Sequence, residues 1–191
     1  MEDSRITWLR SLGARIGSEV FFGPDVYVEH DFAPLLTIED GVVLARGVSI
    51  ILHDSSLNNV LGAPLKFGRI ILRKECYIGA NTTILCGVEI GTHAIVGAAS
   101  LVTHSIPDRM VAYGQPARVH GTIEELAAKQ AAPQDEQRWH YLPFIPWRDR
   151  LNSVAQDDQQ ILRFIDSIAD LPLPRSSHPL HTARTEDVDE A

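Results

Sequence analysis

Residues 78–107 read IGANTT, ILCGVE, IGTHAI, VGAASL and VTHSIP, and this stretch decides the fold. Every sixth residue is aliphatic, the residue after it is glycine in three of the five hexads, and the fifth position is small or branched. An α-helix returns an apolar residue every three or four positions, so a period of six excludes a helix. Six residues suit one short strand and one corner, and three such units form a triangular coil whose strands pair in parallel with those of the next coil.

The same period continues toward the N-terminus with shifted phase. The first positions of all twelve hexads are Ile16, Phe22, Val28, Ile38, Leu44, Ile50, Leu72, Ile78, Ile84, Ile90, Val96 and Val102. Twelve hexads make about four coils, and at a strand spacing of about 4.8 Å the prism is roughly 19 Å tall. We therefore expect an all-β fold, a parallel β-helix over residues 14–120, with these side chains inside. The glycine that often follows them either relieves crowding or supplies unusual backbone angles.

Two breaks in the phase locate insertions. Between Val28 and Ile38 the chain uses four residues more than one hexad, and between Ile50 and Leu72 it uses four more than one full coil. The second break contains an excursion loop, predicted over residues 54–69, which is polar and contains glycine and proline. Loops that leave a regular scaffold commonly carry the functional residues.

The segments outside the repeat are expected to be helical or disordered. Residues 1–13 are predicted to form a short N-terminal helix that caps the open end of the prism, as a solenoid requires. Thr122 and Glu125 have the spacing of a capping box, which predicts a helix to about Ala131. With the helical spacing at 149–169, we expect a helical C-terminal extension over 121–170. Residues 171–191 are polar and contain proline, which predicts a disordered tail.

Composition narrows the possible partners. The formal net charge of −8 disfavours nucleic acid and anionic membranes, which attract clusters of lysine and arginine. No apolar run approaches the roughly 20 residues of a membrane span, and the N-terminus lacks the apolar core of a secretory signal. We therefore expect a cytoplasmic protein without a membrane span. Cys76 and Cys86 are the only cysteines, and they are expected to be reduced, partly buried thiols.

Several of these runs together resemble a known family. The run IILHDSS (50–56), the excursion after it, and the repeats that end in GQPAR (114–118) resemble the hexapeptide-repeat acyltransferases, above all their sugar and polysaccharide O-acetyltransferase branch. The likeness covers about residues 10–130. It implies a left-handed β-helix, a handedness that the repeat alone leaves open, and a homotrimer with active sites between subunits. It also implies acetyl-CoA as acyl donor and a hydroxyl of a sugar or glycan precursor as acceptor.

The resemblance assigns the catalytic base to His53, which stands just before the excursion. A neutral imidazole can remove the hydroxyl proton as the oxygen attacks the thioester. Asp54 follows directly and either holds the acceptor, helps to orient His53, or is a plain loop carboxylate. Subtracting one coil of 18 residues and the four-residue insertion from 53 places Asp31 beneath His53. His30 and Asp31 are therefore expected to border the acceptor site, with a capping role at the first insertion as the alternative.

Matching the family residue by residue also implies a coenzyme A track. Ala80 and Ala98, one coil apart, would offer backbone groups to the pantetheine arm. Thr103 and Arg118 match positions that contact the cofactor, and the guanidinium would serve as a cation for the phosphates. His104 occupies a position where the family commonly has lysine, and it is assigned to the same cofactor site.

Three alternatives remain beside O-acetylation. The first is N-acetylation of an amino sugar or small metabolite, and the second is a catalytically silent trimeric scaffold, which His53 and GQPAR disfavour. The third is a zinc site of the carbonic anhydrase type. His53 and His93 fall in the same column but two coils apart, about 9.6 Å, whereas two ligands of one zinc ion must lie closer. We therefore expect no metal.

Overall fold

The computed structural model divides the chain into two units, residues 1–132 and 133–191. It describes residues 3–131 and, in the second unit, only residues 163 and 167. The predicted helical extension beyond residue 131 and the predicted disordered tail 171–191 therefore lie outside the described residues, apart from those two positions.

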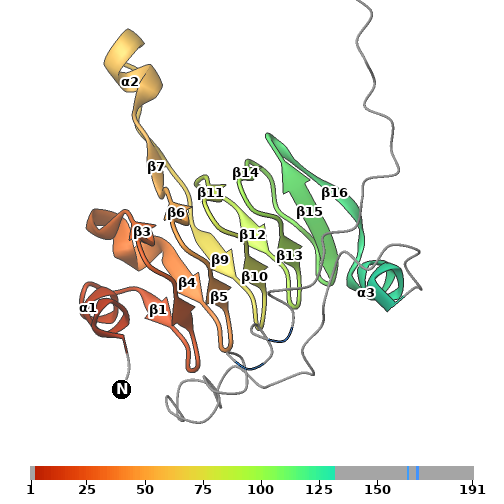
Figure 1. Ribbon diagram of the computed structural model, residues 1–191. Coiled ribbons are helices and arrows are strands. Elements are labelled where there is room, and N and C mark those ends of the chain that lie inside the picture. The colour runs from red at the N-terminus through yellow and green to blue at the C-terminus, as the bar shows by residue number, and fades with distance from the viewer. Residues whose placement is uncertain (1–2, 132–162, 164–166, 168–191) are drawn as a thin grey trace, which may run out of the picture. The chain divides into compact units, whose positions relative to one another are not determined.

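Three of the four sheets form the coils of the first unit (Figure 1). Sheet 1 contains β1 (Arg15–Ile16), β4 (Leu36–Ile38), β9 (Ile70–Leu72) and β12 (Glu89–Ile90). Sheet 2 contains β2 (Phe21–Phe22), β5 (Val43–Leu44), β10 (Tyr77–Ile78), β13 (Ile95–Val96), β15 (Met110–Gly114) and β16 (Ala117–Thr122). Sheet 3 contains β3 (Tyr27–Val28), β6 (Ser49–Ile50), β11 (Thr83–Ile84) and β14 (Leu101–Val102).

Successive strands along the chain belong to different sheets, and each sheet pairs strands that are one coil apart. Within the three sheets, all neighbouring strands are parallel except β15 and β16, which form an antiparallel hairpin at the C-terminal end. The predicted parallel β-helix is confirmed by this topology. Stacking each strand directly on its counterpart satisfies the backbone donors and acceptors of both.

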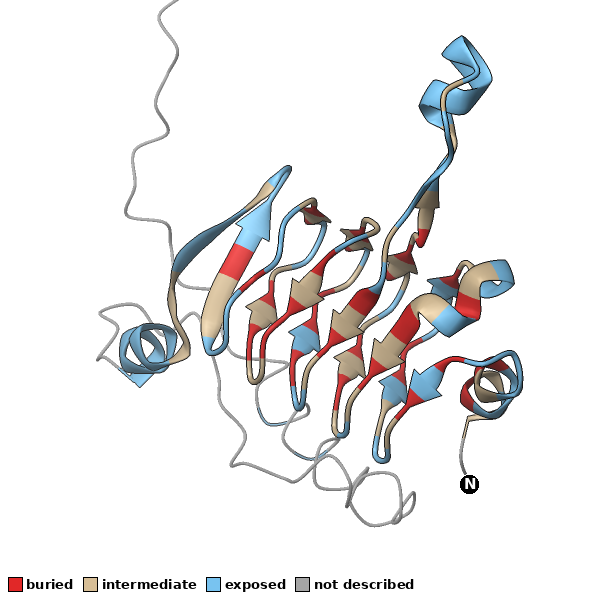
Figure 2. Cartoon of the chain, turned by 180° about the vertical axis from the view of Figure 1, so that it is seen from behind, coloured by how far each residue is buried: buried red, intermediate tan, exposed pale blue. Residues whose placement is uncertain are grey.

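The core is built from the repeat. Each of the twelve predicted first positions is the last residue of its strand and is at most 9% exposed. Fifth-position residues lie between them, and those of the later coils are mostly buried as well, among them Val42, Val48, Cys76 and Val88. Figure 2 shows these buried segments recurring on every coil. Two polar side chains among residues 3–131 are buried and are also bonded, since the hydroxyls of Thr82 and Ser100 donate to the Gly97 carbonyl at 3.1 and 2.7 Å.

Close approach between coils explains the repeated glycine. A Cβ on Gly79 would lie 2.5 Å from the backbone nitrogen of Ala98, and one on Gly23 would lie 2.7 Å from that of Arg46. Neither glycine has a positive φ. The crowding explanation is therefore correct for these positions, and the left-handed backbone occurs elsewhere, at corner residues such as Gly47 (φ +70°).

The helix α1 (Ser4–Ser11) covers the N-terminal end of the prism (Figure 1). Its Ile6 and Leu9 are buried against the first coil. Arg5 donates to the carbonyls of Phe22 and Gly23, and Arg10 donates to those of Ile16 and Gly17. The first coil has no coil beneath it, so these arginines satisfy acceptors at an open sheet edge. The predicted short N-terminal helix is confirmed.

Two insertions and a C-terminal helix leave the regular coils. The first insertion is the 3₁₀ helix η1 (His30–Leu35). The second, here called the arm, comprises β7 (His53–Asp54), the exposed helix α2 (Ser56–Leu61) and β8 (Lys66–Phe67), and β7 pairs antiparallel with β8. Figure 1 shows the arm projecting from the prism.

After β16, α3 (Ile123–Ala131) begins with the predicted capping box. Thr122 N donates to Glu125 Oε2 at 2.9 Å, and Glu125 N donates to Thr122 Oγ1 at 3.2 Å. None of the helices in the described part of the chain is long and apolar enough to cross a membrane.

Candidate active site

His53 stands at the root of the arm, beside a carboxylate. Its Nδ1 lies 2.6 Å from Glu29 Oε1, and the two side chains are 27% and 13% exposed. Nδ1 is itself buried and makes no regular hydrogen bond, so the pair is a close contact between the imidazole and the carboxylate. The exposed part of the imidazole is therefore the side away from Nδ1. A carboxylate at Nδ1 favours a proton on that nitrogen, which leaves Nε2 able to accept one.

Glu29 is held in place by the backbone of the next coil. Its own N–H donates to Ile50 O at 3.1 Å, continuing the pairing of β3 with β6. Its Oε2 accepts from Leu52 N at 2.7 Å and from His53 N at 3.0 Å. Charge-assisted bonds of this kind offset the cost of burying a carboxylate. The same side chain thus orients both the backbone and the ring of His53.

The structure brings Glu29, and not the predicted Asp31, into polar contact with His53, while the assignment of Asp31 to the border of the acceptor site stays a prediction. Counting residues assumes that the strand continues past Val28, but η1 begins at His30 and turns the chain away. Asp31 is 76% exposed, and its Oδ1 lies 3.6 Å from His30 Nε2. The His30 ring in turn packs on Trp8 with a centroid distance of 5.0 Å. The sequence did contain one signal for Glu29. It is an acidic residue directly after Val28, which is the last core residue before the first insertion.

Two phenyl rings complete the surroundings of His53. The ring of Phe32, from η1, lies 4.8 Å from the imidazole centroid at an interplanar angle of 54°. The ring of Phe67, from β8, lies 6.0 Å from it at 27°. Phe32 and Phe67 contact each other edge to face at 5.1 Å. Both insertions therefore contribute to the environment of one histidine, and neither phenylalanine was identified from the sequence.

Asp54 has a local partner. Its Oδ1 accepts from Ser56 N at 3.0 Å, and this hydrogen bonding lowers the pKa of Asp54 below its usual value. On the arm it pairs with Lys66 of β8. This bond places Asp54 at the start of α2, and the roles predicted for it stay predictions.

A second set of predicted residues lies toward the C-terminal end. His104 and Arg118 line one groove of about 340 Å³, together with Ser105, Ile106, Ala112, Ala117 and Val119. Thr103 Oγ1 lies 2.9 Å from His104 Nδ1. The hairpin β15–β16 thus brings Arg118 to the residues that follow β14. A guanidinium and an imidazole in one groove are suited to bind an anion.

Ala80 and Ala98 lie on a different corner of the prism. The pairing of β10 with β13 places them in corresponding turns of successive coils, between sheets 2 and 3. Ala98 is exposed and Ala80 is half-buried, and Ala80 O accepts from Ala99 N at 2.7 Å. His53 and His104 instead follow strands of sheet 3 on the way to sheet 1. One chain therefore does not bring all the predicted residues together.

The described residues contain no group of three or more histidine, cysteine or acidic side chains that could hold a metal ion. His93, the second histidine of the zinc alternative, has its Nε2 2.9 Å from Glu75 Oε2. It thus belongs to a separate histidine–carboxylate pair, which is half-exposed at a corner of the prism.

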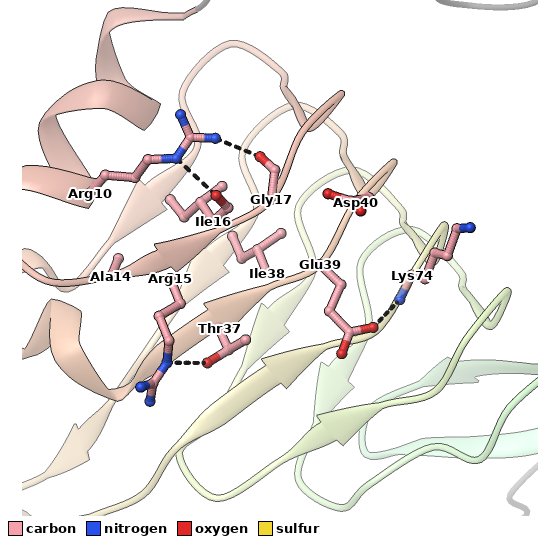
Figure 3. Close-up of a pocket in the computed structure, with 10 residues that line it drawn as sticks. All are labelled: Arg10, Ala14, Arg15, Ile16, Gly17, Thr37, Ile38, Glu39, Asp40 and Lys74. Atoms are coloured by element: carbon pink, nitrogen blue, oxygen red, sulfur yellow. Dashed lines mark hydrogen bonds between the residues drawn. The ribbon is translucent and has the colours of Figure 1, made fainter.

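A shallow groove of about 550 Å³ lies on sheet 1 beside α1 (Figure 3). Its charged side chains bond to the protein itself. Arg10 donates to two backbone carbonyls, Arg15 Nε donates to Thr37 Oγ1 at 3.4 Å, and Glu39 accepts from Lys74 N at 2.9 Å. None of the predicted site residues lines this groove, so we do not assign the reaction to it.

Comparison with known proteins agrees with the fold, although no family model matches the chain. The chain is 44% identical over 84 residues to a dTDP-3-amino-3,6-dideoxy-alpha-D-galactopyranose 3-N-acetyltransferase of Aneurinibacillus thermoaerophilus, covering 41% of this chain and 44% of that protein. It is 31% identical over 119 residues to the galactoside O-acetyltransferase of Escherichia coli, covering 57% of each. The chain thus spans about half the length of these relatives.

Among solved structures, a hexapeptide-repeat-containing acetyltransferase of Vibrio cholerae aligns with a TM-score of 0.51 and 21% identity. The alignment covers 63% of this chain and 80% of that one, which supports the shared fold. The sequence relatives of the chain are thus acetyltransferases, and its structural neighbours are hexapeptide-repeat acetyltransferases whose fold it shares.

Proposed function

We propose that the protein transfers an acetyl group from acetyl-CoA to a hydroxyl of a sugar or glycan precursor, with His53 as general base. The observation that carries this proposal is the pair of His53 and Glu29. The carboxylate contacts the buried Nδ1 at 2.6 Å and leaves the exposed part of the ring toward solvent. The sugar acetyltransferases among the relatives support the acceptor class.

In the proposed reaction, acetyl-CoA supplies an activated acetyl thioester. Nε2 of His53 takes the proton of the acceptor hydroxyl as the oxygen bonds to the acetyl carbon, and it then delivers that proton to the coenzyme A sulfur as the carbon–sulfur bond breaks. While Nε2 holds the proton, the ring is a cation, and the Glu29 carboxylate stabilises it. The reaction balances in atoms and charge, and it requires no serine or cysteine nucleophile.

The groove between His104 and Arg118 fits the phosphates of coenzyme A. Arg118 Nη1 donates to Ala117 O at 2.9 Å, which leaves further guanidinium donors for a ligand. β6 and β14 lie in the same sheet two coils apart, which is about 10 Å at ordinary strand spacing. We therefore assign Thr103, His104 and Arg118 to the cofactor, with Ala80 and Ala98 along the pantetheine arm.

We further propose a homotrimer of left-handed β-helices that acts in the cytoplasm. Ala80 and Ala98 lie on a different corner from His53, so a second copy of the chain is needed to complete a site. His30, Asp31 and Asp54 are then assigned to the acceptor side of that site. An active monomer in light scattering would contradict this arrangement.

N-acetylation of an amino sugar is the second candidate, and the 44% identity to a sugar 3-N-acetyltransferase favours it. An amine is a better nucleophile than an alcohol, so it needs less help from a base. The product separates the two reactions, since hydroxylamine cleaves an acetyl ester but leaves an amide intact.

The test is an acceptor screen with acetyl-CoA over neutral and amino sugars, with release of free thiol as the readout. His53→Ala is expected to lower kcat by about 10²- to 10⁴-fold, the usual contribution of a general base. His93→Ala is a matched control, because it removes another histidine that contacts a carboxylate. Wild-type turnover in His53→Ala would refute the assignment, and equal losses in both variants would indicate a structural effect.

A further inference from the structure

We propose that Phe67 is an acceptor-binding residue, whose exposed phenyl ring beside His53 stacks on the C–H face of the acceptor's pyranose ring. This inference rests on the proposed function, because it names how that site recognises a sugar. Nothing in the sequence repeat points to Phe67, which lies in the arm outside the hexads.

The arm brings Phe67 to the base by strand pairing. Phe67 of β8 is directly opposite His53 of β7 in their antiparallel pair. Residues opposite each other in such a pair have their side chains on the same face, with Cβ atoms about 4.5–5.5 Å apart. The return of the arm is fixed to the prism where Gly68 N donates to Leu52 O at 3.2 Å. The position of Phe67 relative to His53 is therefore set by backbone hydrogen bonds.

The orientation of the ring is set by a second aromatic residue. Phe32 contacts the Phe67 ring edge to face at 5.1 Å and an angle of 72°, and it also packs on the imidazole at 4.8 Å. Such contacts between aromatic rings favour defined geometries over free rotation. Phe67 is thus held as a nearly rigid surface inclined by 27° to the His53 ring.

Despite these contacts, Phe67 remains 48% exposed. Leaving half of a phenyl ring in water forfeits part of the roughly 1.5–3 kcal/mol that full burial contributes. The exposed apolar residues of α2, such as Leu57 and Val60, lie farther along the arm. Among the exposed large apolar side chains that the structure describes, Phe67 is the one whose ring contacts the His53 ring.

The chemistry of this surface matches a pyranose. One face of such a sugar presents C–H groups that carry slight positive charge, and the face of a phenyl ring carries slight negative charge. The sugar's hydroxyls project from the rim of its ring, where Nε2 of His53 can take a proton. Lys66 and Asp54, the adjacent opposed pair on the arm, are exposed and offer polar groups to other hydroxyls.

The test compares Phe67→Leu with Phe67→Tyr, using a pyranoside acceptor and a small acyclic alcohol. Phe67→Leu keeps an apolar side chain against His53 but removes the stacking surface, so KM for the pyranoside should rise about 3- to 10-fold. Phe67→Tyr should stay within about twofold. KM for acetyl-CoA, the pH profile, and turnover of the acyclic alcohol should not change. Tyr77→Leu, which removes another half-exposed aromatic ring on sheet 2, is the matched control.

The remaining outcomes distinguish a failure of the stacking proposal from a failure of the proposed function. An unchanged KM for the pyranoside in Phe67→Leu, with an active wild type, overturns the stacking proposal alone. Equal losses with both acceptors and a shifted pH profile would make Phe67 a positioning residue for His53, which also overturns it. A wild-type protein that acetylates no sugar would overturn the proposed function, and this inference with it.

Discussion

Replacing Glu29 with glutamine tests the proposed mechanism most directly. In the structure Oε2 of Glu29 accepts two backbone hydrogen bonds, and Oε1 contacts His53 Nδ1 at 2.6 Å. A glutamine oxygen in the place of Oε2 keeps both backbone bonds. The amide nitrogen then faces Nδ1 and donates to it, which forces the ring proton onto Nε2. His53 would keep its position, but the form of the ring with a free Nε2 would lose the stabilisation that Glu29 gives it.

The expected loss follows from the interaction removed. Once the ring is a cation, we expect the contact between Nδ1 and Oε1 to reach the strength of a hydrogen bond to a charged group, about 1.5–3 kcal/mol. If that energy is present only while the imidazole is a cation, kcat/KM falls about 10- to 150-fold in Glu29→Gln. The free energy of unfolding should change by less than about 1 kcal/mol, because the backbone bonds survive.

The assay is release of free thiol from acetyl-CoA, with urea unfolding of the same preparations. Glu75→Gln serves as a control, since it alters the carboxylate that contacts His93 in the same way. A Glu29→Gln enzyme that retains kcat/KM within about threefold would refute the role of Glu29. A loss of activity that tracks a loss of stability would show that Glu29 serves only the fold.

Three further predictions concern the coils and the cofactor. Gly79→Ala should lower the free energy of unfolding by about 1–3 kcal/mol in urea titrations, because its Cβ would overlap the next coil. Gly87 has φ +84° and open space around it, so Gly87→Asn should lower that free energy by less than about 1 kcal/mol. Equal losses in the two variants would contradict the crowding argument. Burial raises the pKa of the Cys76 thiol to about 12, so at pH 8 a thiol reagent should label only half-buried Cys86 in the folded protein. Both cysteines should be labelled in denaturant. Rapid labelling of both cysteines in the folded protein would disprove the burial of Cys76. Arg118→Ala should raise KM for acetyl-CoA roughly 3- to 30-fold and leave the acceptor KM unchanged; an unaltered KM for acetyl-CoA would remove Arg118 from the cofactor site.

Counting along the sequence located the core because the repeat is local. Each hexad places one aliphatic residue at the end of a short strand, and parallel stacking carries the same phase into the next coil. Positions as far apart as Ile16 and Val102 therefore become interior residues for one reason. The sequence left two explanations for the glycines, and only the distance from Gly79 to the next coil decided between them.

Counting residues by hexad does not give the neighbours of segments that leave the repeat. The same arithmetic that placed Ile50 above Val28 also placed His53 above Asp31, but β3 ends at Val28 and η1 begins at His30. Phe32 and Phe67 became neighbours of His53 through two insertions whose paths no periodicity describes, and Glu29 reaches it from the last paired residue before the first of them.

By itself, then, the sequence determined the coils, their interior and the histidine before the arm, because these follow from a period of six and a family pattern. The tertiary structure decided which carboxylate and which rings surround His53. It also showed that the predicted cofactor residues occupy two corners of the prism. Those relations depend on where irregular segments return to the coils, and that is set by contacts between residues far apart in the chain.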